Sequence, residues 1–204
     1  FRVKPDVLLV HNEAIRDEAI RYNDIKREDI IVTGLPQFDV YKEKPASRSV
    51  FFKRYGLDPE KKTILIAPHG KRFHDSDWEL LQIIKDALQA DDLSESVQCI
   101  VRMPPNDCID WGSFVMPAGW ALQEPGVGFQ EGVCRDRELT HEDSRELFNT
   151  LFHSDAVINY GSTLTIDAAA LDRPTIIVSF DGYRKRPIER SVRKFLKYTH
   201  IQNL

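Results

Sequence analysis

Short apolar segments alternate with amphipathic segments along most of this chain, and this alternation limits the possible folds more than any other feature. The clearest apolar segment is KTILIAP (62–68), whose continuous run of Ile, Leu and Ala is typical of a strand buried on both faces. It is followed by DSDWELLQIIKDALQA (75–90), which has apolar residues at helical spacing and an Asp or Ser that can cap the helix. A buried strand therefore leads directly into a helix.

The same alternation recurs on both sides of this pair. Further strands are expected at 6–10, 29–34, 97–103, 155–159 and 174–179, and further helices at 13–23, 49–56, 140–154, 163–172 and 187–198. Strands that alternate with helices predict an α/β fold, here a Rossmann-like doubly wound parallel sheet with helices on both faces. Residues 105–136, rich in Gly, Pro and aromatic side chains, are expected to be irregular.

The composition suits a soluble globular protein that can bury a core. The chain has 204 residues, of which 42% are hydrophobic and 29% charged, and its net charge of −4 gives no electrostatic reason to expect a nucleic-acid partner. The three cysteines are odd in number and show no CxxC spacing, so we expect neither a disulfide framework nor a zinc site, and we expect a cytoplasmic protein. No apolar run approaches the roughly 18 residues of a membrane span. The chain begins without Met, and we expect it to be a fragment of a longer protein.

The strand-to-helix junctions are the places to look for a ligand site, because doubly wound sheets bind ligands at the carboxyl ends of their strands. At the first junction, APHGKRFHDSD, a flexible backbone at Gly70 lies beside three cationic candidates, His69, Lys71 and Arg72. Arg can grip phosphate with two hydrogen bonds, Lys acts as a point charge, and His can transfer a proton. The alternative is a solvated loop whose charges bind nothing specific.

The second junction, RMPPND, forces a turn at its two prolines. Arg102, at the end of its strand, either faces the ligand crevice or lies on the surface, which is the more frequent case.

The third junction, NYGSTLTIDAAAL, places small residues after Tyr160, between a strand and a helix. Gly161 lets the backbone approach a ligand, and Ser162 and Thr163 can both cap the helix and donate to phosphate oxygen. Asp167 lies one turn further on the same face, where a carboxylate can accept hydrogen bonds from ribose hydroxyls. The alternative is an ordinary capped helix in which Asp167 only compensates the helix dipole.

Other candidates have a plain structural alternative. Trp111 and Trp120 either stack on a base or sugar or, as aromatics in irregular segments more often do, pin their segment to the core. His153, in an apolar helix end, is expected to be packed. No metal-ligand cluster occurs at a recognisable spacing.

In their order, these segments resemble the carboxyl-terminal half of GT-B-fold enzymes. The resemblance is to the UDP-N-acetylglucosamine 2-epimerase group and to related bacterial surface-polysaccharide glycosyl- and glycerophosphotransferases, and it covers about residues 5–200. DIIVTGLPQFDVY (29–41) looks like the family's interdomain segment, KKTILIAPHG like its first carboxyl-domain strand, and SDAVINYGSTLTIDAAALDRPTIIV like its donor-binding segment. The basic loop lacks the fuller His-Arg-Glu-Asn pattern of the epimerases, and the Trp-rich segment 108–130 has no counterpart in them.

The resemblance implies residue roles. Gly161, Ser162 and Thr163 would hold the donor pyrophosphate, and Asp167 stands where the family usually has Glu to take the ribose hydroxyls. His69 falls where the epimerases carry a ligand-contacting His, and it is the catalytic candidate. The segment of Arg137, Leu139 and Thr140 lies where the family contacts the nucleotide base through backbone groups.

The implied protein is the donor-binding half of a metal-independent glycosyltransferase in bacterial surface-glycan synthesis. It would have no cofactor and would use a nucleotide sugar as substrate with a glycan or lipid-linked acceptor. The alternatives are a UDP-N-acetylglucosamine 2-epimerase-like enzyme and a non-catalytic nucleotide-sugar-binding module. The expected domains are residues 1–45 (the end of an amino-terminal domain and the linker), 46–185 (the nucleotide-sugar-binding domain) and 186–204 (a carboxyl-terminal helix). The basic segment 184–197 either touches acidic membrane lipid or is a solvated helix face.

Overall fold

The computed structural model describes residues 4–73, 75–129 and 137–179. The chain forms two compact units, Phe1–Glu43 and Lys44–Leu204. The helix expected within 186–204, with its suggested membrane contact, lies outside the described residues.

The first unit contains one parallel strand pair and one helix. Its elements are β1 (Leu8–Val10), α1 (Glu13–Asn23), the short 3₁₀ helix η1 (Arg27–Asp29), β2 (Ile30–Val32) and the 3₁₀ helix η2 (Pro36–Lys42). Strands β1 and β2 pair in parallel, with Leu8 opposite Ile30. Val10, Ala19 and Ile30 form a small core.

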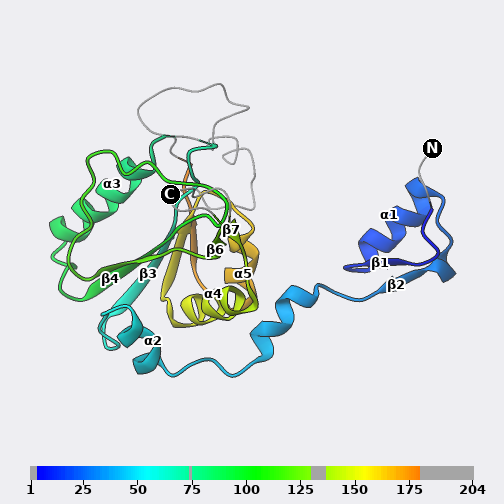
Figure 1. Ribbon diagram of the computed structural model, residues 1–204, viewed down its shortest axis with the longest axis horizontal. Coiled ribbons are helices and arrows are strands. Elements are labelled where there is room, and N and C mark those ends of the chain that lie inside the picture. Colours follow the sequence, from blue (N-terminus) through cyan, green and yellow to red (C-terminus); the bar gives the residue numbers. More distant parts are fainter. Residues whose placement is uncertain (1–3, 74, 130–136, 180–204) are drawn as a thin grey trace. The chain divides into compact units, whose positions relative to one another are not determined.

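The second unit is built on a five-stranded sheet in which every strand is parallel to its neighbours. The spatial order is β5-β4-β3-β8-β9, with β3 (Lys62–Ala67), β4 (Val97–Arg102), β5 (Trp120–Gln123), β8 (Ala156–Asn159) and β9 (Thr175–Ile177). From β3 the chain moves outward to β4 and β5, then returns to the other side of β3 for β8 and β9 (Figure 1). This reversal makes the sheet doubly wound, as the sequence predicted, with its switch point between β3 and β8.

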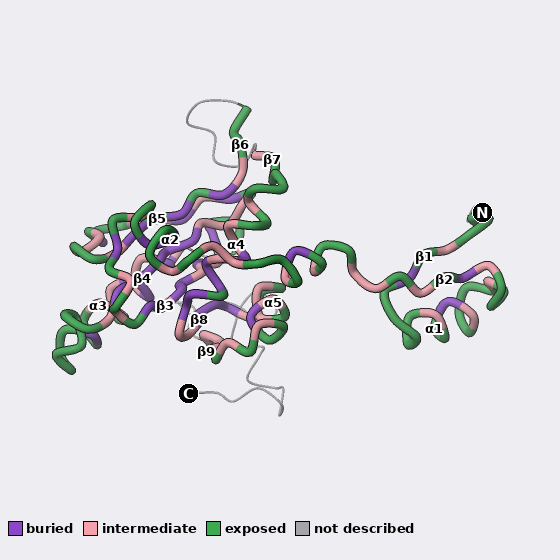
Figure 2. The backbone as a smooth tube through the Cα atoms, turned by 90° about the horizontal axis from the view of Figure 1, so that it is seen from below, coloured by how far each residue is buried: buried purple, intermediate pink, exposed green. Residues whose placement is uncertain are grey.

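Helices cover both faces of the sheet because successive strand residues point to opposite sides. Leu65 packs on one face with helices α2 (Arg48–Arg54), α4 (His141–His153) and α5 (Leu164–Ala170). Its neighbour Ile66 packs on the other face with helix α3 (Asp77–Ala90). The buried residues consequently follow the strands through the middle of this unit (Figure 2).

In its described part, the segment expected to be irregular (105–136) contains two short strands, so that expectation is wrong for β5 and β6 (Val127–Gly128). Strand β7 (Arg137–Glu138) begins directly after the segment. Strands β6 and β7 pair antiparallel. Trp111 and Trp120 pack with the core cluster under α3, which confirms that they pin the segment.

The cysteines depart from the expectation drawn from their number. Cys108 is disulfide-bonded, whereas Cys99 is free and buried. The cysteine count therefore gives no support to a reducing compartment.

Candidate functional site

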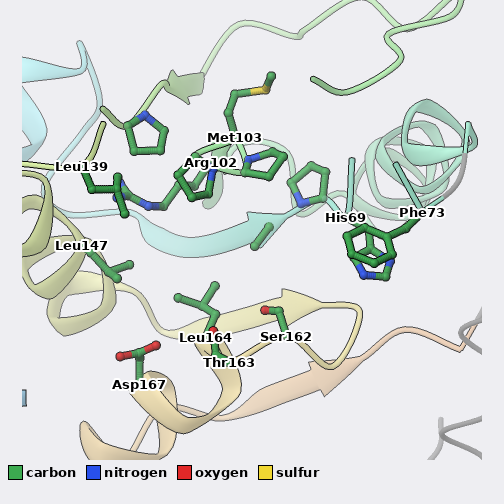
Figure 3. Close-up of a pocket in the computed structure, with 15 residues that line it drawn as sticks. His69, Phe73, Arg102, Met103, Leu139, Leu147, Ser162, Thr163, Leu164 and Asp167 are labelled. Carbon is green, nitrogen blue, oxygen red and sulfur yellow. The ribbon is translucent and has the colours of Figure 1, made fainter. Parts of the chain in front are cut away.

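A cavity of about 460 Å³ opens at the carboxyl edge of the sheet, beside the switch point. Its wall comes from the segments that follow β3, β4, β5 and β8, and from residues before and within α4 (Figure 3). The lining residues are Ala67, Pro68, His69, Phe73, Arg102, Met103, Pro104, Pro105, Pro125, Leu139, Leu147, Ser162, Thr163, Leu164 and Asp167. Six of the residues predicted from the sequence belong to this set: His69, Arg102, Leu139, Ser162, Thr163 and Asp167.

The turn between β8 and α5 is made by a residue that the sequence reading missed. The Asn159 side-chain oxygen accepts the N–H groups of Gly161 at 2.7 Å and Ser162 at 3.1 Å, and the Thr165 hydroxyl at 3.2 Å. Gly161 has a φ of 74°, the left-handed region in which glycine is at little cost. An Asn two residues before a Gly is a known turn signal and could have identified this residue.

Because Asn159 makes the turn, Ser162 and Thr163 do not cap the helix as predicted. Thr163 occupies the N-cap position of α5 but makes no side-chain cap hydrogen bond. Both side chains are exposed and line the cavity. Asp167 lines it one helical turn after Thr163 (Figure 3).

Of the three cationic candidates in the loop after β3, His69 alone lines the cavity. The His69 ring stacks on Phe73, with centroids 4.0 Å apart and planes 2° apart, and on Tyr160 at 5.5 Å and 12°. Tyr160 is only 1% exposed, so it supports His69 from behind and does not line the cavity. Lys71 and Arg72 are exposed and lie outside the wall.

Two buried carboxylates hold the backbone of this loop. Asp77 accepts the N–H groups of His69 and Gly70, both at 2.9 Å, and Asp107 accepts that of Arg72 at 2.7 Å. Burial raises the pKa of Asp77 to about 6, the two N–H bonds oppose this rise, and the nearby carboxylates of Asp107 and Asp110 reinforce it.

Arg102 ends β4 and is 8% exposed, so the reading as a surface residue is wrong. Its guanidinium donates to the Gln123 side chain at 3.0 Å and lies 3.8 Å from a carboxylate oxygen of Glu146. Glu146 also accepts the hydroxyl of Tyr55. Burial first, and then Glu146, raise the pKa of Tyr55, which keeps its hydroxyl protonated as a donor. Arg102 thus brings a positive charge to the cavity wall that the neighbouring polar groups partly balance.

The predicted residues before α4 have two kinds of role: some hold the fold together and one lines the cavity. Arg137 donates to the carbonyl oxygens of Glu124 at 3.1 Å and Gly126 at 2.7 Å, which ties its guanidinium to the turn before β6. Thr140 and Asp143 cap α4 reciprocally, confirming the predicted capping pattern. Leu139 is the member of the predicted base-contacting segment that lines the cavity.

His153 is buried, as expected, and its Nε2 lies 2.8 Å from the carbonyl oxygen of Ala46. Burial lowers its pKa, helped by the charges of Arg48 and Arg173, so its ring is neutral and donates through Nε2–H.

Two features are absent from the described residues. They contain no group of three or more His, Cys, Asp or Glu side chains placed to hold a metal ion. None of their helices is both long and apolar enough to pass through a membrane.

Fold and cavity together define an α/β domain of the Rossmann-like class with a site at the switch point of its sheet. Among the solved structures that share this fold are the following two. The wall teichoic acid polymerase TagF matches with a TM-score of 0.52 and 18% identity, over 86% of this chain and 40% of that one. A complex of MnaA from S. aureus with UDP matches with a TM-score of 0.52 and 17% identity, over 84% of this chain and 42% of that one.

Sequence comparison finds a similar protein that is named for a UDP-sugar. A UDP-N,N'-diacetylbacillosamine 2-epimerase (hydrolyzing) of Legionella pneumophila is 29% identical over 185 residues, which are 89% of this chain and 44% of that protein. No family model matches. The chain thus spans less than half the length of these relatives.

Proposed function

We propose that this chain is the donor-binding part of a GT-B glycosyltransferase in bacterial cell-surface glycan synthesis, and that its cavity holds the nucleotide diphosphate of an activated sugar. The observation that carries the proposal is the convergence of His69, Ser162, Thr163 and Asp167 on one cavity beside the switch point. These residues come from separate junctions of the sheet. The similarity to a complex with UDP and to an epimerase named for a UDP-sugar supports the same ligand class.

We place the diphosphate at the start of α5. Asn159 already occupies the N–H groups of Gly161 and Ser162. The groups left for phosphate oxygens are therefore the hydroxyls of Ser162 and Thr163 and the first free amides of the helix. Asp167, one turn along, accepts the ribose hydroxyls.

Positive charge in the cavity wall comes from Arg102, with His69 when it is protonated. Hydrogen bonds and charges that act on the leaving diphosphate lower the barrier when they stabilise the transition state more than the bound donor. A glycan or lipid-linked acceptor would approach from the remainder of a longer protein. This chain alone should therefore bind donor and turn it over slowly.

Thermal-shift measurements with UDP, CDP, GDP and their sugars test the proposal. We expect one nucleotide series to stabilise the domain, since a ligand at 100 times its Kd adds about 2.7 kcal/mol. Gly161→Asp should abolish that shift by placing a carboxylate beside the diphosphate. Gly119→Asp is the matched control, because Gly119 has a similar φ of 80° in open surroundings. Equal shifts for wild type and Gly161→Asp would refute the assignment.

A 2-epimerase is the second candidate, favoured by the epimerase relative at 29% identity. One experiment separates the two enzymes. The protein is incubated with UDP-N-acetylglucosamine or with the UDP-N,N'-diacetylbacillosamine named for that relative, and the products are searched for the epimer or the released sugar. Binding without turnover, with or without an acceptor, would favour a non-catalytic module.

A further inference from the structure

Asp77 is an acid whose placement the proposed function does not explain. It is the first residue of α3 and is 0% exposed. Its two carboxylate oxygens are used separately, Oδ1 by the N–H of His69 and Oδ2 by the N–H of Gly70. The carboxylate thus reaches back across the junction and binds two consecutive amides at the end of β3.

A second carboxylate holds the other end of the same loop. Asp107 is 6% exposed and accepts the N–H of Arg72 through Oδ2, while its Oδ1 accepts the N–H of Cys108 at 2.9 Å. The carbonyl oxygen of Cys108 accepts the N–H of Lys71 at 2.8 Å. The backbone of residues 69–72 is therefore held at four consecutive amides.

The space beside the loop is closed as well. Gly70 has a φ of +94°, and a Cβ added there would lie 2.6 Å from Oδ2 of Asp107. Only glycine can adopt this positive φ and also fit beside Asp107 without displacing its carboxylate.

The His69 ring is the one side chain of this clamped stretch that lines the cavity. Its plane is set by the stacked ring of Phe73, from the same loop, and by Tyr160, from the end of β8. A backbone fixed at His69 and Gly70, with rings stacked on the imidazole, leaves that ring little freedom.

Burying a carboxylate is costly, and an exposed Ser or Asp would serve a helix start equally well. A buried acid at this position is therefore better explained by what it holds than by α3 itself.

We propose that Asp77 is a positioning residue of this site, whose carboxylate fixes the backbone at His69 and Gly70 and thereby aims the imidazole into the cavity. Asp107 completes the clamp at the basic end of the loop. The clamp stands on the contacts alone, but its effect on nucleotide binding rests on the proposed function.

A double-mutant cycle with UDP as the probe tests the inference. Asp77→Asn keeps the shape of the side chain but turns one acceptor into a donor that faces an N–H group. We expect about tenfold weaker UDP binding, the factor that corresponds to the loss of one hydrogen bond to a charged group. In the His69→Ala background the same change should have little further effect, because the ring that it positions is gone. Asp86→Asn, at an exposed site on the same helix, is the matched control and should bind UDP like wild type.

Ring-to-ring NOEs between His69 and Phe73 supply a readout that needs no ligand. We expect them in the wild type and in Asp86→Asn, and we expect them to weaken in Asp77→Asn. If UDP, CDP and GDP all fail to bind the wild type, the proposed function fails, while the NOEs still decide on the clamp. If Asp77→Asn does not fold, Asp107→Asn takes its place in both measurements. Unchanged NOEs, or an equal loss of UDP affinity with and without the His69 ring, would overturn the inference.

Discussion

The burial of Asp77 predicts that the contribution of this residue to the stability of the protein falls as the pH rises from about 4 to about 7. The pKa of this carboxyl is raised from 3.8 to about 6 in the folded chain, mainly by burial. Between these values the folded state keeps a proton that the unfolded state has released. The contribution is therefore fully present below about pH 4, falls as the pH rises through about 6, and stays constant above that. At about 1.36 kcal/mol for each pH unit, the loss amounts to about 3 kcal/mol.

Other acids act in the opposite direction, so the measurement must isolate Asp77. Partial burial raises the pKa of Asp155, but hydrogen bonds from Lys62 and Thr63 outweigh it and lower that pKa overall. Urea unfolding of the wild type and of Asp77→Asn at pH 4, 5, 6 and 7 cancels this background, because both proteins share it.

The stability of the wild type relative to Asp77→Asn should fall by about 3 kcal/mol between pH 4 and pH 7. Asp86→Asn, at an exposed site on the same helix, is the control for the exchange of an Asp for an Asn. The reasoning would be refuted if the difference in stability between the wild type and Asp77→Asn stayed constant or grew with pH. Asp77 would then not be held in a costly buried state.

Three further changes give expectations that can be measured. Arg48→Lys should destabilise by about 2 kcal/mol in urea unfolding, because the guanidinium donates to three backbone carbonyl oxygens and an ammonium cannot reach them all; equal midpoints would contradict this. Gly70→Ala should lower the free energy of unfolding by clearly more than the about 1 kcal/mol expected for Gly56→Ala. Both glycines have positive φ, but of the two only Gly70 is crowded, by Asp107. Similar losses for the two variants would mean that Asp107 moves aside. Asp167→Ala should weaken UDP binding about tenfold but leave binding of 2′-deoxy-UDP less affected, as calorimetry can check; equal losses for both ligands would remove Asp167 from the ribose.

The sheet could be predicted because its inner strands can be recognised from their apolar sequences. An apolar run marks β3, a mostly apolar one marks β4, and helix α3 between them shows a clear apolar face. Strand β5 was missed for a physical reason. Its buried Gln123 is polar because it serves Arg102 and the Thr150 hydroxyl, so the strand lacks the apolar run expected of a buried one.

The position of the candidate site could be predicted better than the roles of its residues. Strand ends in a doubly wound sheet meet at one edge, so locating the junctions was enough to find the cavity. The sequence does not show which groups face inward. Lys71 and Arg72 are exposed, and their amides are held by the Cys108 carbonyl oxygen and by Asp107. Asp77, at the start of α3, turns back to accept the amides of His69 and Gly70. These roles depend on contacts between segments that are not adjacent in the sequence.

Four of the residues that line the cavity are prolines: Pro68, Pro104, Pro105 and Pro125. Their ring-locked backbones have little freedom to lose when a ligand arrives, so this part of the wall should look alike in empty and occupied crystals. They also lack N–H groups, so this part of the wall can select a ligand by shape but cannot donate backbone hydrogen bonds to it. In the proposed function the α5 side supplies those bonds. An inhibitor for this site should therefore pair a flat, rigid apolar group for the proline side with an anion on a short tether.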